Sequence, residues 1–384
     1  ARKIFAGAER IDPTGRKDPP AEPLDPVEQT CAEYPLNDYG NGLRFLAYGG
    51  REKALFVPRV GWHVWSGKVW RLDEDKVEIR ALAQRVGERI LEEVPFVALT
   101  EEERAALKAW DEVEAEFAEL LIKAKDDKTP ADRNRERELM RLQEASQAAR
   151  KALSSRKRAH TNHAKAAGNT SQINNMLTEA GVEIATPLDK LNRDPLAINT
   201  ISGVVRLIEG APGNWSYVLE DHRRDHLISK MMPVEVDEDA DCPTFMAFLE
   251  RIQPDDEMRD FLRRWFGYSL TGLTGEQKLV FAHGAGRNGK STLVDAIAAI
   301  MADYATTVPI ESLTGSEQRK GSDATPDLVR IPGARMVRAS EPEHGTKMKE
   351  ALIKALTGGE PILIRRMQQE FVEVTPEFKL TIQG

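Results

Sequence analysis

The chain has 384 residues, of which 41% are hydrophobic and 30% are charged, a composition that suits two or three domains with solvent-rich surfaces. Its formal net charge of −8 gives no overall signal for nucleic acid, although a local basic lining binds phosphates at any total charge. The only cysteines, Cys31 and Cys242, make neither a disulfide framework nor a Cys-x-x-Cys zinc motif, so we expect a reducing cytoplasm. Because no run of about 18 apolar residues occurs, no membrane span is expected.

The two ends of the chain suggest a piece of a longer protein. The first residues, ARKIFAGAERID, lack a Met and the apolar core of a signal peptide, and the last ones, FKLTIQG, have strand character. Residues 11–35 are rich in proline and acidic residues and show no apolar period. Residues 1–35 are therefore predicted to form a linker.

Residues 36–99 differ from the preceding linker in composition and in apolar pattern. Alternating apolar and aromatic positions with glycine turns predict a small β-rich N-terminal unit. Its tryptophans, Trp62, Trp65 and Trp70, would either stack on nucleic-acid bases or fill the core of the unit. Because large aromatic residues are more often buried than functional, the core interpretation is favoured.

Residues 100–165 are predicted to form a charged helical hairpin. Thr100 and Glu103 make a capping box, and Thr129 followed by Pro130 marks the start of the second helix. In the first helix, large apolar residues recur every three or four positions, as a helix requires: Leu107, Trp110, Val113, Phe117 and Leu120.

The second helix of this hairpin carries a cluster of basic residues. The cluster comprises Arg150, Lys151, Arg156, Lys157 and Arg158. Such a cluster either binds nucleic-acid phosphates or forms a solvated helix face, and the solvated face is the favoured interpretation.

Residues 166–273 mix short helical patterns and turns, which predicts a helical collar or lead-in domain. Within it, the segments DCPTFMAFLERI and PDDEMRDFLRRWFGYSLTG are predicted to be amphipathic helices, each opened by Asp or Pro.

The segment KLVFAHGAGRNGKSTLVDAIAAIM reads as a strand, a glycine-rich turn and a helix, which is the order of a phosphate loop. Glycines let backbone amides point at phosphate, and the following helix N-terminus adds partial positive charge. Lys290 would reach the β- and γ-phosphates of ATP, and Ser291 would bind Mg²⁺. The predicted nucleotide-binding residues are Gly284, Ala285, Gly286, Arg287, Asn288, Gly289, Lys290, Ser291 and Thr292.

A carboxylate is needed beside such a loop to polarise the attacking water and to help hold the metal. The best candidate is Glu341, which ends a predicted strand at residues 334–340. Glu343 lies close by in sequence, and a solvated loop position is favoured for it. Glu341 could instead cap the predicted helix in KMKEALIKALTGG, but the preceding phosphate loop favours a catalytic role.

The sequence resembles the superfamily 3 helicases, in particular the phage and plasmid primase–helicase group related to the poxvirus replication NTPase. The likeness covers roughly residues 36–384. It is carried by CPTFMAFLERI, FLRRWFGYSLTG, QKLVFAHGAGRNGKSTLVDAIAAIMADYA, DLVRIPGARMVRASEPEHG and LIKALTGGEPILIRRM, with weaker support from NDYGNGLRFL and GWHVWSGKVWRLD.

The resemblance implies an α/β fold with an AAA+-type P-loop NTPase core and a parallel sheet, spanning residues 274–384. Such motors assemble as rings, usually hexamers, around single-stranded or forked DNA, and ATP hydrolysis drives strand separation. Carried over to this chain, Lys290 and Ser291 hold phosphate and Mg²⁺, and Glu341 takes the Walker B role. Lys354, Arg365 and Arg366 fall where the family contacts DNA, although the two arginines would equally suit a surface salt-bridge pair.

Three departures from the family pattern matter. Ser340 precedes Glu341 where many members have a second acid, and Glu360 stands where Asp is common. The family's γ-phosphate-sensing Asn and its arginine finger would lie beyond residue 384. We therefore expect this chain to bind ATP but to hydrolyse it poorly. No metal-binding acidic group or zinc motif precedes residue 36, so no priming activity is assigned.

The sequence thus predicts an ATP-dependent DNA helicase of phage or mobile-element replication that acts in a bacterial cytoplasm, with other replication proteins as partners. A P-loop kinase remains an alternative, and DNA should not stimulate it. An ATP-gated loader or scaffold is a second alternative, in which ATP switches assembly without turnover.

Overall fold

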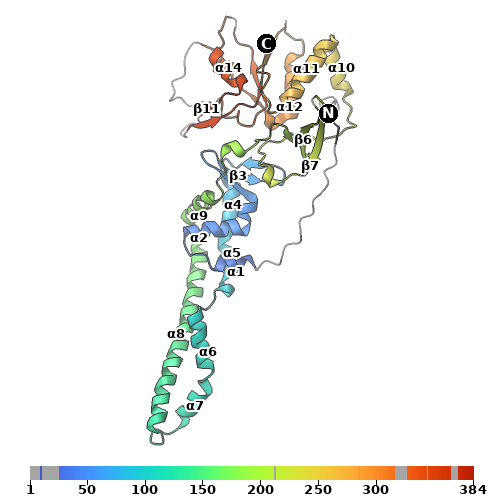
Figure 1. The fold of residues 1–384 in the computed structure, drawn as a ribbon. Coiled ribbons are helices and arrows are strands. Elements are labelled where there is room, and N and C mark those ends of the chain that lie inside the picture. The colour runs from blue at the N-terminus through green and yellow to red at the C-terminus, as the bar shows by residue number, and fades with distance from the viewer. Residues whose placement is uncertain are drawn as a thin grey trace. The chain divides into compact units, whose positions relative to one another are not determined.

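The computed structural model describes residues 9–10, 26–211, 213–284, 286–315, 327–343, 345–364 and 371–384 (Figure 1). The chain divides into two compact units. The first, here called the α/β unit, comprises Ala1–Asp18, Leu55–Glu74 and Ala185–Gly384, and the second, the helical unit, comprises Pro19–Ala54 and Asp75–Ile184. Within the described part of the chain, no helix has both the length and the apolar composition needed to cross a membrane.

The helical unit is built around contacts between helices that are distant in sequence. α2 packs against α9, and α5 packs against both α1 and α8. The short elements of the unit are α1 (Val27–Ala32), α2 (Asp38–Phe45), η1 (Leu46–Gly50), α3 (Arg51–Lys53), α4 (Val77–Gln84), α5 (Val86–Glu93), η2 (Val94–Phe96) and α9 (Thr170–Glu183).

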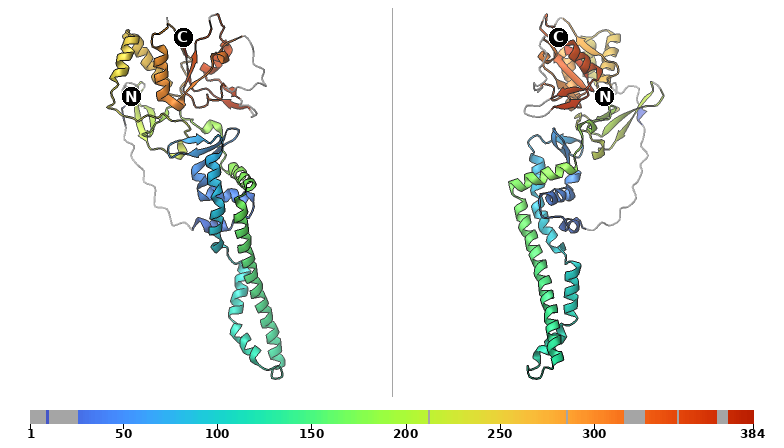
Figure 2. Two further views of the ribbon diagram at one scale, coloured as in Figure 1. Left: turned by 180° about the vertical axis from the view of Figure 1, so that it is seen from behind. Right: turned by 60° about the vertical axis from the view of Figure 1, so that its left-hand side comes forward.

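A long hairpin makes up the rest of the helical unit. Its first arm is α6 (Glu101–Asp111) and α7 (Glu114–Ile122), and its second is α8 (Pro130–Ala167). Both expected helix starts are confirmed, because Thr100 and Thr129 each form a capping box. α6 and α7 run along α8 in both further views (Figure 2). The buried side chains of Trp110, Phe117, Leu120 and Leu139 hold the arms together.

A buried ionic cluster ties the helical unit together where α2, α5 and α8 meet. Arg44 of α2 donates from Nε to both carboxylate oxygens of Glu93 of α5, at 3.0 Å each, and both side chains are fully buried. The Tyr48 hydroxyl donates to Glu93 at 2.6 Å, and His160 Nε2 of α8 lies 2.7 Å from the same carboxylate. The remaining Arg44 donors bind the carbonyls of Cys31, Tyr34 and Pro35.

The centre of the α/β unit is a four-stranded sheet in the order β8-β13-β10-β9, with every neighbouring pair parallel. Its strands are β8 (Leu279–Ala282), β9 (Ala305–Thr307), β10 (Met336–Ser340) and β13 (Lys379–Gln383). The expected strands at 278–283 and 334–340, and the strand character of FKLTIQG, are confirmed. Because all four strands are parallel, their carboxyl ends lie at one edge.

Other elements cover both faces of this sheet, so its central strands β13 and β10 are largely buried, whereas the outer strands β8 and β9 are partly exposed. On one face pack α11 (Asp256–Ser269) and α12 (Lys290–Met301), together with Met336 of β10. On the other face pack α14 (Glu350–Gly358) and the antiparallel pair β11 (Ile362–Ile364) and β12 (Val372–Val374). α11 and α12 lie on the side of the sheet away from α14 (Figure 1). The Trp265 indole of α11 also donates to Thr381 of β13 at 3.0 Å.

Two smaller sheets complete the α/β unit. One has the order β2-β3-β4, from β2 (Ala54–Val57), β3 (Gly61–Trp65) and β4 (Trp70–Leu72), with β3 and β4 antiparallel. The other has the order β1-β7-β6-β5, from β1 (Glu9–Arg10), β5 (Ala197–Asn199), β6 (Val204–Glu209) and β7 (Trp215–Glu220). The remaining elements are η3 (Leu188–Lys190), η4 (Arg224–His226), α10 (Pro243–Ile252), η5 (Ala302–Tyr304) and α13 (Ile310–Leu313).

The structure divides the N-terminal half differently from the sequence-based domains. Residues 36–99 are not one β-rich unit, because residues 55–74 join the α/β unit and the flanking helices join the helical unit. The linker predicted for residues 1–35 does not extend through its last ten residues. Helix α1 is ordered by its contacts with α5, and buried Arg44 binds carbonyls of this segment.

The predicted helical domain at residues 166–273 also needs correction. α9, α10 and α11 are helical, but residues 197–220 form strands β5, β6 and β7. The cross-strand pairing runs from Val204↔Glu220 to Glu209↔Trp215, and it buries Val204, Val205, Tyr217 and Val218. Strands this short carry a weak alternating pattern, which is why the segment resembled turns and helices.

Candidate functional site

The loop between β8 and α12 has the backbone conformation that its glycines were expected to permit. Gly286 and Gly289 have φ values of 71° and 83°, and Arg287 between them has a φ of 49°. Left-handed conformations of this kind are favourable only for glycine and for a few polar residues. Tight turns of this kind can point backbone amides toward an anion, although the Gly286 amide donates to the Gly284 carbonyl at 2.8 Å. Ala285 lies outside the described residues.

Lys290, the first residue of α12, is turned back onto this loop. Its ammonium group donates to the carbonyl of Gly284 and to Oδ1 of Asn288, each at 3.0 Å. A Cβ atom on Gly284 would stand 2.3 Å from Asn288 Nδ2 and 3.2 Å from Lys290 Nζ. The loop therefore needs glycine at position 284 so that the lysine can lie across it.

Gly289 sits in close contact with the lead-in helix α10. A Cβ atom there would lie 2.5 Å from Cγ2 of Ile252, whereas a Cβ on Gly286 would meet nothing within 4 Å.

Gly289→Ala is therefore expected to cost about 2–4 kcal/mol of unfolding free energy, from left-handed strain plus overpacking. Gly286→Ala is expected to cost about 1–2 kcal/mol, from strain alone. Urea unfolding of the two variants measures this difference, and equal losses would contradict the packing argument.

Ser291 and Thr292 lie in the first turn of α12 with exposed side chains. They follow Lys290 at the amino terminus of a 12-residue helix, where unpaired backbone N–H groups and the helix dipole favour negative charge. The predicted helix of residues 290–301 is confirmed, and Leu293 and Ile297 bury its inner face.

Glu341 directly follows β10 and lies at the same edge of the sheet as the loop. Its Oε1 is 3.7 Å from Nδ1 of His283, the residue that follows β8. The carboxylate is 46% exposed, so it can reach a bound molecule. The structure thus brings Glu341 to the glycine-rich loop, although 50 residues separate them in sequence. Glu343 is exposed two residues further on.

Strand β13 lies between β8 and β10, and it brings a residue that the sequence analysis missed. Gln383 pairs with Ala282 on one side and with Ser340 on the other. Its side-chain Oε1 is buried and has no hydrogen-bond partner among the described residues. A polar residue at the end of a buried strand was the available signal, but strand order was needed to place it here.

The predicted DNA-contacting residues are only partly described. Lys354 is on α14 with its side chain 79% exposed, and its Nζ is 4.0 Å from the Glu350 carboxylate. Arg365 and Arg366 lie outside the described residues. The strands that flank them in sequence, β11 and β12, are antiparallel, with Ile364 opposite Val372.

Burial and ion pairing test the expectations for the three tryptophans and for the basic cluster of α8. Trp62 and Trp70 are buried, and Trp65 packs against Trp70, which confirms the core interpretation. In the basic cluster, Arg156 pairs with Glu103 of α6 at 2.5 Å. Arg156 therefore serves the hairpin itself, whereas Arg150, 64% exposed and 4.0 Å from Asp111, lies on a solvated part of the helix.

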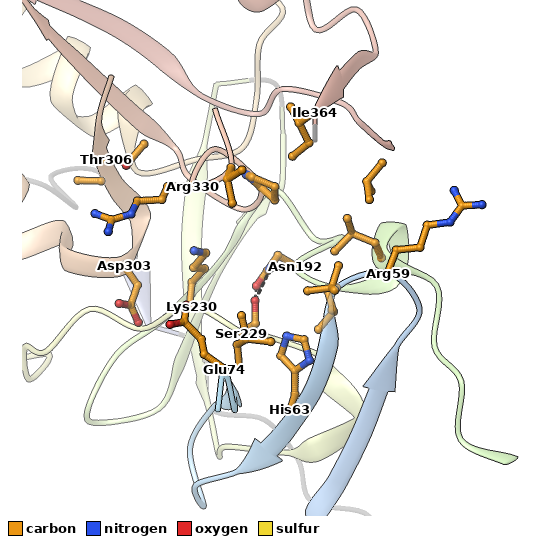
Figure 3. A pocket seen from close by; sticks show the side chains of 18 of the residues that line it. Arg59, His63, Glu74, Asn192, Ser229, Lys230, Asp303, Thr306, Arg330 and Ile364 are labelled. Carbon is orange, nitrogen blue, oxygen red and sulfur yellow. Dashed lines mark hydrogen bonds between the residues drawn. The ribbon is translucent and has the colours of Figure 1, made fainter. Parts of the chain in front are cut away.

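A cavity of about 490 Å³ lies elsewhere in the α/β unit, near the amino ends of β9 and β10. Figure 3 shows Lys230, Asp303 and Arg330 on one side of it and His63 on the other. Its wall is fixed by Asn192, which donates to the Ser229 hydroxyl and accepts from the Ser229 amide, each at 2.8 Å. Its lining residues do not include the glycine-rich loop or Glu341, so it is a separate feature.

Part of the chain matches a known protein family. The family model described as D5 N terminal like matches residues 42–254, which is more than half of the chain. The chain therefore belongs to the D5 N terminal-like family. This match covers most of the helical unit and the first part of the α/β unit, and it ends before the glycine-rich loop.

Two curated relatives carry helicase names. The protein named putative helicase L207/L206 of Acanthamoeba polyphaga mimivirus is 30% identical over 147 residues, 38% of this chain and 15% of that protein. The protein named putative helicase 022R of Frog virus 3 (isolate Goorha) is 26% identical over 141 residues, 36% of this chain and 14% of that protein. The chain thus matches about one seventh of the length of each.

Among solved structures, the A form apo structure of the NrS-1 C terminal region is 16% identical to this chain, with a TM-score of 0.30. The matched region covers 46% of this chain and 39% of the NrS-1 chain. Another apo structure of the same region is 17% identical, with a TM-score of 0.30 and coverage of 46% and 40%. Scores at this level establish neither a shared fold nor a shared function.

Proposed function

We propose that the α/β unit is the ATP-binding motor of a replicative DNA helicase of viral or mobile-element origin. The observation that carries the proposal is the meeting of Lys290, the left-handed glycines and Glu341 at the carboxyl edge of one parallel sheet. In open α/β sheets, ligands bind at this edge. The helicase-named viral relatives and the family membership support the choice of a helicase among nucleotide-binding proteins.

The chain's own groups suit a nucleoside triphosphate. Backbone amides of residues 287–290 and the amino terminus of α12 would bind the β- and γ-phosphates. Lys290 would exchange its two loop oxygens for phosphate oxygens, because a charged acceptor makes a stronger hydrogen bond than a neutral one. Glu341 would accept a proton from the attacking water or orient it.

The expected Mg²⁺ fits the donors at this edge. The Ser291 hydroxyl and the Glu341 carboxylate are exposed oxygen donors, and Mg²⁺ prefers one or two such protein ligands beside phosphates and waters. When bound there, the ion would neutralise charge on the transferred phosphoryl group. The buried Oε1 of Gln383, which has no hydrogen-bond partner among the described residues, would accept a hydrogen bond from a water at the same edge.

Assembly and DNA contact complete the proposal. The ring, expected to be a hexamer, would place nucleotide between neighbouring subunits and DNA in the centre, with Lys354, Arg365 and Arg366 as DNA-contacting residues. Cations on α14 and on the segment between β11 and β12 would bind the phosphate backbone without reading its sequence. A bacterial cytoplasm and other replication proteins as partners remain part of this proposal.

The role of Glu341 is tested by Glu341→Gln beside Glu343→Gln as the matched control. Because the amide keeps the shape but loses the charge and the basic oxygen, ATP affinity should stay within about threefold. Hydrolysis, measured in the longest natural protein that contains this chain, should fall about 100-fold. Glu343→Gln should hydrolyse ATP at close to the parent rate. ATP binding by fluorescence titration and phosphate release give both quantities. Equal rates for the two variants would remove Glu341 from the proposed chemistry.

A further inference from the structure

The second arm of the hairpin carries a row of cations that form no ion pair among the described residues and that the proposed motor does not use. Of these, Arg137 donates within α8 itself, to the Arg133 carbonyl and the Asn134 side chain. The side of α8 that packs against other helices is marked by its buried residues, among them Leu139, Ser146, Ala149, His160 and Ala164. The opposite side, here called the outer face of α8, carries six exposed cations: Arg133, Arg137, Arg141, Lys151, Arg158 and Lys165.

Ion pairing separates this face from the rest of the hairpin. Three of the four acidic residues of α8 are already paired: Asp132 with Lys123, Glu136 with Lys128 and Glu138 with Arg135. The fourth, Glu144, is the one acid on the outer face. By contrast, the structure gives none of the six cations an ion pair with any described residue. The outer face therefore has a net charge of about +5 in a chain whose total is −8.

The six cations form two evenly spaced groups, separated by the ten-residue step of about 15 Å from Arg141 to Lys151. Arg133, Arg137 and Arg141 are four residues apart, and Lys151, Arg158 and Lys165 are seven apart. At about 1.5 Å of rise per residue, these steps are about 6 Å and about 10 Å, and the row is about 48 Å long. The helix is continuous from Pro130 to Ala167, and its packed inner face holds the six cations on one side of it. A nucleic-acid strand carries a phosphate about every 3.4 Å of helix axis, so each cation of such a row would have a phosphate within reach.

The composition between the cations decides which polyanion fits. Protein partners usually anchor on buried aromatic or large apolar side chains at the centre of an interface. On the outer face only Met140 is of this kind, and the other intervening side chains are small or polar, such as Ala148, Ser155 and Asn162. Phosphate backbones need charge and little apolar surface.

We propose that the outer face of α8 is a second nucleic-acid site, which holds the phosphate backbone outside the motor without reading its sequence. The choice of nucleic acid over another polyanion rests on the proposed function, but the contact itself requires no ATP. Six cations in one row bring a strand or duplex to the protein and keep it there while the motor steps. The site adds affinity that depends steeply on salt.

The test compares two triple variants of the whole chain with equal change of charge. Arg137→Gln, Lys151→Gln and Arg158→Gln remove three outer-face cations with a residue that favours helix. Arg51→Gln, Lys53→Gln and Lys108→Gln remove three exposed cations on other faces of the same unit. Binding of fluorescent single-stranded and duplex oligonucleotides is measured by anisotropy without nucleotide, from 50 to 200 mM salt.

The outer-face variant should bind at least about 10-fold more weakly at 50 mM salt. The slope of log K against log salt should become shallower by about 2 to 3, because each lost contact contributes about 0.9 on a duplex. A loss with the duplex alone assigns a duplex track, and a loss with the single strand alone assigns a single-strand track. Equal binding by the two variants, or no binding by the parent chain, overturns the proposal.

A further variant separates this inference from the proposed function. Lys290→Ala should leave DNA binding by the outer face of α8 unchanged, because Lys290 is not part of α8 and belongs to the proposed ATP site. If DNA binding depends on the outer face while ATP turnover ignores DNA, the helicase proposal fails and this site stands. If ATP turnover responds to DNA equally in both triple variants and their affinities match, the helicase proposal stands and this site fails.

Discussion

Lys290→Ala is expected to lower the affinity of the chain for ATP about 10- to 100-fold, the equivalent of one or two charged hydrogen bonds to phosphate. In the parent, the Lys290 ammonium bridges Gly284 and Asn288 across the glycine-rich loop, so it is already held where phosphates would bind. Hydrolysis should fall by at least about 100-fold, because the charge that stabilises the transition state is lost along with the binding contact.

Lys278→Ala provides the control for this experiment. Lys278 is an exposed lysine that immediately precedes β8, at the opposite end of the strand that leads into the loop. Its removal changes the net charge equally but leaves the carboxyl edge of the sheet intact. Titration with a fluorescent ATP analogue should distinguish the two variants by at least about tenfold. Equal affinities, with unchanged thermal midpoints, would show that Lys290 does not bind the nucleotide.

Glu93→Ala is expected to destabilise the helical unit by about 3–5 kcal/mol. Removing one partner of a buried ion pair leaves the other charge uncompensated, here Arg44, which is fully buried. The change also leaves Tyr48 and His160 without their shared acceptor. Glu92→Ala is the matched control, because its carboxylate is 54% exposed and pairs with Arg89 at the surface. The control should cost less than about 1 kcal/mol.

Chemical unfolding followed by circular dichroism measures both variants, and hydrogen exchange along α8 shows whether the loss falls on the helical unit. Comparable losses for Glu93→Ala and Glu92→Ala would show that the buried cluster is not a main source of stability.

The same cluster gives this unit a pH dependence. Burial alone would raise the pKa of Glu93, but hydrogen bonds from His160 and Tyr48 and the Arg44 charge outweigh it and lower the pKa. The stability that Glu93 provides is therefore present above its unfolded pKa, near 4.3, and is lost as pH falls through the lower folded value.

Burial, Arg44 and His160 also lower the pKa of His163. Because the unfolded chain then binds more protons, stability falls as pH drops below about 6.5.

The elements around the glycine-rich loop could be predicted from sequence because local patterns determine them. The strand before the loop, the helix after it and the strand ending at Ser340 all appear as expected. Glycines at left-handed positions and the capping boxes at Thr100 and Thr129 are equally local signals.

The features that sequence reasoning missed depend on contacts between distant segments. Nothing local shows that β13 inserts between β8 and β10, and this order alone brings Gln383 beside the loop and Glu341. Likewise, residues 55–74 have the pattern of a separate β unit, but their partners lie after residue 185, as in the pairing of Phe56 with Ala185. Arg44 and Glu93 look like ordinary surface charges until the fold buries both.

The most direct test of a DNA-driven motor is ATP hydrolysis by the longest natural protein that contains this chain, measured with and without single-stranded DNA. We expect strong stimulation by DNA, and loss of both basal and stimulated turnover in Lys290→Ala. Turnover that is the same with and without DNA would contradict the helicase proposal and favour a kinase. Tight ATP binding without any turnover would contradict it as well and favour an ATP-gated loader.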